Sequence, residues 1–356
     1  MSNVDEFGLR SFVQASEKYV QVAPRLVAWI ALWFPFEQRA LVLQVMAVAI
    51  VAVLGAVIAW AIEVQTESRL LGVLIGLVFL TIPAASESTL GNAGSFKWPL
   101  LATLGIVAVC PKFYTKYMWF TALLTAFVGL SSPMFVVALL PVLWIVATHR
   151  ASLRQVRSIL FAGGLGFVIQ GFAWMLKNRQ VKIYGDSIQQ TPWPGMGVFW
   201  YLAWIGPTIV AVVVITSVFI FRRHLTWPGS DIRSATLWLS GVSIILSLLV
   251  HISAGIKDSA AVATQTLSWS AVVLFSTSLL STRNLNLFLR VVASLSLALL
   301  VLFSAKWFGA SSYLAGGPTW RSEAERAALE CESPAVDEVQ IQLNLAVVEI
   351  SCAKLG

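Results

Sequence analysis

The chain has 356 residues, of which 58% are hydrophobic and 12% are charged, whereas about a quarter of the residues in a soluble domain are charged. This composition excludes an ordinary soluble enzyme. The apolar residues form blocks long enough to cross a bilayer, so we expect an all-α polytopic membrane protein. The formal net charge of +7 does not indicate nucleic-acid binding, because the basic residues lie in short loops, as in cytoplasmic loops that face anionic membrane lipids.

Residues 1–39 are expected to form an N-terminal segment at the surface of the membrane. The apolar run Leu26–Phe36 is too short to span a bilayer, and Trp29 and Trp33 are typical of a helix that lies in the interface. Pro24 suits the first turn of such a helix.

Residues 40–307 are expected to form a bundle of about ten transmembrane helices. The predicted spans are 40–62, 69–83, 98–110, 118–130, 134–148, 158–176, 197–221, 235–253, 262–280 and 285–307. Segments 98–110 and 118–130 are short for a bilayer, which needs roughly 20 apolar residues, so we expect them to extend into their flanks or to pack inside the bundle. The glycines of Gly163-Gly-Leu-Gly166 lie within a span and indicate close helix packing, not a phosphate loop.

The basic residues predict the orientation of these spans, because cytoplasmic loops carry an excess of lysine and arginine. One set of alternate loops holds eleven: Arg69, Lys112, Lys116, Arg150, Arg154, Arg157, Arg222, Arg223, Arg233, Arg283 and Arg290. The short loops of the other set hold six: Lys97, Lys177, Arg179, Lys182, Lys257 and Lys306. We therefore expect a multi-pass protein of the inner (plasma) membrane with residues 84–97 and the C-terminus outside. The N-terminus is then also outside, which implies either an unusual translocation or a first span that this chain lacks.

A polar island at residues 84–98 interrupts the apolar segments on the outer side. It groups a carboxylate, an amide, an ammonium and an indole, namely Glu87, Asn92, Lys97 and Trp98. Charge near a bilayer is costly and usually functional, so Glu87 is the best candidate for a base or for a group that binds a metal or hydroxyls. The acidic pair Asp5-Glu6 is a second candidate. The alternatives are a Glu87–Lys97 surface pair that holds the loop, and a solvated terminus.

Residues 308–356 form a soluble-like tail. Ser322 and Glu325 make a capping-box pattern ahead of a helical segment, and residues 339–343 and 346–352 are typical of two strands. A unit this small needs a staple. We therefore expect an extracytoplasmic tail with a short helix, a β-hairpin and a disulfide between Cys331 and Cys352.

Several of these stretches resemble the multispanning GT-C-type glycosyltransferase-like proteins of bacteria, which use polyprenyl-phosphate sugars. The resemblance lies in Tyr19-Val-Gln-Val-Ala-Pro-Arg-Leu-Val-Ala, in Ser86-Glu87, Gly91-Asn92 and Trp98, in Gly129-Leu-Ser-Ser-Pro133 with Leu140-Pro141, and in the tail with Gly317-Pro-Thr-Trp320 and its two cysteines. The chain departs from the family where Lys18 and Ser132 replace glycines and Gln21 replaces a histidine. The family also has a first span before an acidic outer loop, and this chain starts inside that loop.

The resemblance implies a site on the outer face that takes a lipid-linked sugar donor. Glu87, or Asp5 or Glu6, would then be the general base that deprotonates the acceptor hydroxyl. Arg25 or Lys97 would hold the phosphate leaving group, Trp98 would stack on a sugar ring, and Asn92 would bind substrate. Some members of the family use a divalent metal, which carboxylates would bind, although the sequence has no clustered cysteine and histidine metal motif.

Two other classes of function fit the same composition. A transporter or flippase for a lipid-linked saccharide would need charged or broken helices at mid-membrane, and no predicted span has an acid at its centre. A non-catalytic scaffold of envelope biogenesis would be consistent with a missing first span.

Overall fold

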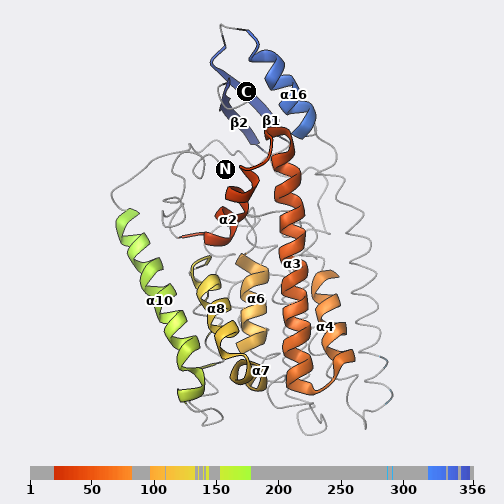
Figure 1. Ribbon diagram of the computed structural model, residues 1–356, viewed down its shortest axis with the longest axis vertical. Coiled ribbons are helices and arrows are strands. Elements are labelled where there is room, and N and C mark those ends of the chain that lie inside the picture. The colour runs from red at the N-terminus through yellow and green to blue at the C-terminus, as the bar shows by residue number, and fades with distance from the viewer. Residues whose placement is uncertain are drawn as a thin grey trace.

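The computed structural model describes residues 20–81, 97–143, 153–177 and 320–352, except for 109, 133–134, 136–138, 140–141, 334–335 and 344–345, and also Leu287 and Val291. These residues are mostly helical, with one two-stranded sheet (Figure 1). The predicted spans 197–221, 235–253 and 262–280, and nearly all of 285–307, lie outside this part of the chain, as does most of 134–148.

Of the helices that the structure describes, α3, Phe36–Thr66, is the longest, and it runs through the length of the helical bundle (Figure 1). At 1.5 Å per residue its 31 residues extend about 46 Å. The predicted span 40–62 lies within it. Two stretches of the described chain are long and apolar enough to cross a membrane, α3 and Val156–Ala173 within α10, Leu153–Lys177.

Helix α4, Arg69–Thr81, packs closely against α3 through glycines. A Cβ atom added to Gly76 would lie 2.7 Å from the carbonyl oxygen of Gly55, and one added to Gly72 would collide with the carbonyl oxygen of Ala59. Small residues are what allow two helix backbones to approach this closely. The two helices are joined by a turn at Glu67, which has a φ of 59°.

Helix α6, Lys97–Ala108, lies in the centre of the bundle. Every residue from Pro99 to Ala108 is buried, so the prediction that this short segment packs inside the bundle is confirmed. Cys110 follows the helix, with its thiol fully buried and 3.1 Å from the carbonyl oxygen of Ile106.

The short helix α7, Pro111–Lys116, closes one end of the bundle, which we call the α7 end. The side-chain carbonyl of Gln65 accepts a hydrogen bond from the backbone of Lys112 at 3.1 Å, and the ammonium of Lys112 lies 2.7 Å from the carboxylate of Glu67. The hydrogen bond and the charge of Lys112 lower the pKa of Glu67. These contacts tie α7 to the end of α3.

Helix α8, Met118–Gly129, packs against α10 through a pair of glycines. A Cβ atom added to Gly166 would lie 3.1 Å from the Cα atom of Gly129, and one added to Gly163 would meet the side chain of Leu139. The prediction that Gly163 and Gly166 serve helix packing is therefore confirmed.

The C-terminal tail forms a small unit of α16, Trp320–Glu330, and a hairpin of β1, Glu338–Leu343, and β2, Ala346–Ser351. The strands pair antiparallel, with Val339 opposite Ile350. The predicted helix and hairpin are present. Helix α16 begins at Trp320, however, so Ser322 lies inside its first turn and not at the N-cap that the capping-box pattern predicted.

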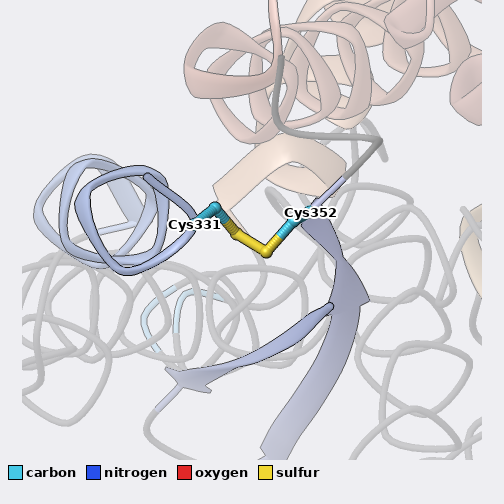
Figure 2. The surroundings of a disulfide bond; sticks show 2 residues. All are labelled: Cys331 and Cys352. Atoms are coloured by element: carbon cyan, nitrogen blue, oxygen red, sulfur yellow. A yellow bond between two sulfur atoms is a disulfide. The ribbon is translucent and has the colours of Figure 1, made fainter. Parts of the chain in front are cut away.

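The predicted disulfide between Cys331 and Cys352 joins the end of α16 to the end of β2 (Figure 2), with a Cα–Cα distance of 5.4 Å. Arg326 binds the carboxylates of Glu323 and Glu330 on its own helix and donates to the backbone carbonyl of Gln340 on β1. These bonds hold the helix against the hairpin.

The tail has its own apolar core, and this core includes the first residue of α3. Phe36 packs with residues of α16 and β1, namely Ala324, Ala327, Val339 and Ile341. The tail therefore sits on the end of α3 that is opposite the α7 end (Figure 1). We call this the tail end of the bundle.

Candidate functional site

Of the residues that the sequence proposed for a site in the bundle, Arg25 is the one whose side chain the structure describes. Lys97 and Trp98 form the first turn of α6, and the structure describes their backbone only. Glu87, Asn92 and the pair Asp5-Glu6 lie outside the described residues. The candidate site is therefore described from Arg25 and from the residues that contact its helix.

Arg25 belongs to α2, Val22–Ala31, near the tail end of the bundle (Figure 1). This helix includes most of the predicted interfacial run, and Pro24 lies in its first turn, as predicted. One face of α2 is buried, through Ala23, Val27 and Ala31, because its small apolar residues fall at helical spacing.

The start of α2 is bonded to two other helices at what we call the α2 junction, made of Val20–Ala23, Gly129–Ser131 and Gln170. The backbone N–H of Val22 donates to the carbonyl of Leu130 at 3.1 Å. The backbone N–H of Ala23 donates to the hydroxyl of Ser131 at 3.1 Å, and that hydroxyl donates to the carbonyl of Phe127 at 2.7 Å. The end of α8 thus caps α2.

The first turn of α2 is capped by residues that follow α8. A helix leaves its first four N–H groups without partners from its own turns. Here Val22 and Ala23 donate to the residues that follow α8, Pro24 has no N–H, and Arg25 makes the first bond within the helix, to the carbonyl of Gln21 at 3.3 Å. These backbone groups of α2 are therefore bonded to protein.

Gln170 on α10 makes the third contact of the junction. Its side-chain carbonyl accepts from the backbone N–H of Val20 at 2.9 Å, and its amide nitrogen donates to the carbonyls of Val20 and Gly129 at 3.1 and 2.8 Å. Both amide hydrogens are used, as is the oxygen. Gln170 is 5% exposed, so loss of any of these bonds would leave a buried polar group without a partner.

The Arg25 side chain, on the same helix, is buried. It is 6% exposed, and this burial lowers the pKa of its guanidinium. An arginine stays protonated even so, because its ordinary pKa lies far above neutral pH. A positive charge is thus held inside the protein at a helix whose start is fixed by α8 and α10.

The junction brings together two stretches that the sequence singled out separately. Val20–Arg25 is part of the stretch that begins at Tyr19, and Gly129–Ser131 is part of the turn that ends at Pro133. Gln170 was missed. Its signal is a lone amide in the apolar part of α10, where a polar side chain needs a partner.

The described residues contain no group of three or more histidine, cysteine, aspartate or glutamate side chains that could hold a metal ion. Glu87 and the pair Asp5-Glu6 are not among the described residues.

Comparison of the chain with protein-family models, with curated proteins and with solved structures gave no match.

Proposed function

We propose that the chain is a multi-pass protein of the inner (plasma) membrane with about ten spans, its α7 end in the cytoplasm and its tail end outside. Two features support this. Only 28% of the residues in the most apolar stretch of α3 are buried, and exposed apolar side chains such as Leu41, Val45 and Val53 leave surface for contact with lipid. Arg69, Lys112 and Lys116 are exposed at the α7 end, where the positive-inside rule places the cytoplasm.

We further propose that the protein is a glycosyltransferase that moves a sugar from a polyprenyl-phosphate donor to an acceptor hydroxyl at the outer face. The observation that carries this proposal is the buried guanidinium of Arg25 on a helix that α8 and α10 hold in place. A charge kept in such a position is usually functional, and a guanidinium fits two oxygens of a phosphate.

The proposed reaction is a substitution at the anomeric carbon of the sugar. The acceptor oxygen forms a bond to that carbon, the bond to the donor phosphate oxygen breaks, and the hydroxyl proton passes to Glu87 or to the pair Asp5-Glu6. Arg25, with Lys97, stabilises the charge that collects on the departing lipid phosphate. Trp98 and Asn92 bind the sugar in this scheme.

The test is sugar transfer from polyprenyl-phosphate donors by the purified full chain in lipid vesicles. We expect Arg25→Lys to raise the donor KM by about tenfold or more, because lysine keeps the charge but loses the paired hydrogen bonds. Arg39→Lys is the matched control, since Arg39 is half-buried and donates to the carbonyl of Phe34, and it should leave the KM unchanged. Glu87→Gln should abolish transfer if Glu87 is the base.

Unchanged transfer by Arg25→Lys and Arg25→Ala, at an unchanged unfolding temperature, would remove Arg25 from the site. Movement of the intact lipid-linked sugar across the vesicle membrane without transfer would favour the transporter function over the enzyme. Transfer that survives in Glu87→Gln would move the role of base to Asp5 or Glu6.

A further inference from the structure

The α2 junction contains a group that bonds Val20, shortly before Arg25, across 150 residues of the chain. Gln170 forms both backbone hydrogen bonds of Val20 and a third to Gly129. Its amide thus bonds Val20 as a neighbouring strand would, although no strand is present at this point. Glutamine is suited to this arrangement because one side chain offers both an acceptor and two donors.

We infer that Gln170 is a positioning residue that holds residues 20–25, and with them the Arg25 guanidinium, against α8 and α10. The role of this position in phosphate binding rests on the proposed function, whereas the docking of residues 20–25 by Gln170 does not. The two parts are therefore tested by separate measurements on the same variants.

Three observations set Gln170 apart from an ordinary buried amide. Its partners are backbone groups of two other segments and not of its own helix. Residues 20 and 21 precede the helix, so the backbone groups of Val20 have no helical partners. Pro24 lies four residues after Val20 and has no N–H, so the Val20 carbonyl cannot accept a helical hydrogen bond from it. The docking of this segment therefore depends on Gln170 and on the end of α8.

The first measurement reports docking without any activity. Ala31, at the far end of α2, is fully buried, so Ala31→Cys provides a reporter in a chain that also carries Cys110→Ala. Cys331 and Cys352 are joined and do not react. We expect Gln170→Leu to speed labelling of this reporter by a maleimide by about tenfold, because the leucine leaves the Val20 backbone groups without partners. An unchanged rate would overturn the inference.

A second variant keeps the test valid if Gln170→Leu folds poorly. In Gln170→Glu the protonated side chain still accepts from Val20 and donates one bond, whereas the ionised side chain donates none. We expect labelling to be slow at about pH 5 and faster at about pH 9, beyond the rise that thiol chemistry itself gives. A chain with the same reporter and Gln38→Glu, at an exposed position at the start of α3, measures how much the labelling rate rises from thiol chemistry alone.

The other charged groups on the packed elements do not obscure this comparison. Arg25 is the one charged residue of α2, α8 has none, and Arg154, Arg157 and Lys177 lie near the two ends of α10. If the Gln170→Glu and Gln38→Glu chains show the same dependence on pH, Gln170 does not hold the segment.

The second measurement is a double-mutant cycle in the transfer assay. If Gln170 acts through Arg25, Gln170→Leu raises the donor KM with little change in kcat, and adds nothing further to a chain that already carries Arg25→Lys. If the two substitutions instead raise the donor KM by factors that multiply, Gln170 does not act through Arg25. A wild-type chain that transfers no sugar from any polyprenyl-phosphate donor would overturn the proposed function, while the labelling result would still decide the docking.

Discussion

Ser131 supplies a cap that α2 does not find in its own sequence. The residue at the N-cap position of α2 is Gln21, which makes no side-chain capping bond, and the hydroxyl of Ser131, just after α8, accepts the N–H of Ala23 instead. A serine that serves a neighbouring helix cannot be recognised from local sequence patterns, because those patterns describe caps within one segment.

Replacing Ser131 should therefore cost stability. We expect Ser131→Ala to lower the free energy of unfolding by about 1–2 kcal/mol, because the buried N–H of Ala23 loses its partner. Thermal unfolding followed by tryptophan fluorescence measures this. Thr115→Ala is the control, since that exposed hydroxyl bonds a carbonyl of its own helix, and its effect should stay within about 0.5 kcal/mol. Equal effects would mean that the cap is not important.

Arg25 and Gln170 show what the sequence reveals about single residues. Arg25 was proposed because it lies in the Pro-Arg stretch that resembles the glycosyltransferase-like family, which implies a phosphate as its partner. Gln170 was not proposed, since one amide in a long apolar helix has no local pattern that names its partners. The resemblance thus pointed to α2, and only the packing of the helices shows that Gln170 bonds Val20 just ahead of it.

At the scale of the elements, helix positions were predictable from apolar length alone. Segments 69–83, 98–110 and 118–130 match α4, α6 and α8 closely, because a long apolar run in this composition favours a helix. The start of α3 was missed. It begins at Phe36, directly after Pro35. Phe36 packs against the tail, and the hydrophobic pattern near residue 40 does not predict this contact.

The close approach of α3 and α4 gives a prediction with a matched control. Gly76→Ala would place a Cβ atom 2.7 Å from the Gly55 carbonyl and 2.8 Å from the Ala59 Cβ atom, so the helices must separate, at a cost of about 1–3 kcal/mol. Gly164→Ala meets nothing within 4 Å and should be neutral or stabilising. The unfolding temperatures of the two variants measure the difference, and a Gly76→Ala protein as stable as Gly164→Ala would show that the packing is loose.

At the scale of the whole molecule, the tail depends on its disulfide. The bond closes a loop with a sequence separation of 21 residues, which by loop entropy stabilises the tail by about 3 kcal/mol. We expect Cys331→Ala with Cys352→Ala to make residues 320–352 sensitive to protease while the helical bundle stays intact. Cys110→Ala, at a buried free thiol, should leave the tail resistant. A resistant double variant would mean that the apolar core around Phe36 and the bond from Arg326 to Gln340 hold the tail without the disulfide.

The contacts between distant segments could not be derived from the sequence. The tail as a unit was predictable, because the two strands alternate and a small unit needs a staple. Its position on Phe36, and the meeting of residues 20–23 with α8 and α10, require the path of the whole chain. Apolar helices have similar surfaces, so their hydrophobic periodicity does not indicate which helices pack against each other.

The hydrogen bond between Val20 and Gln170 also imposes an order on biosynthesis. Val20 is translated 150 residues before its partner, so at 5–20 residues per second its segment waits on the order of 10 s for α10 to emerge. During that interval the backbone groups of Val20 can be satisfied only by water or by lipid headgroups. We therefore expect α2 to dock late, after α8 and α10 have assembled, and a nascent chain that stops before residue 170 should leave α2 open to protease.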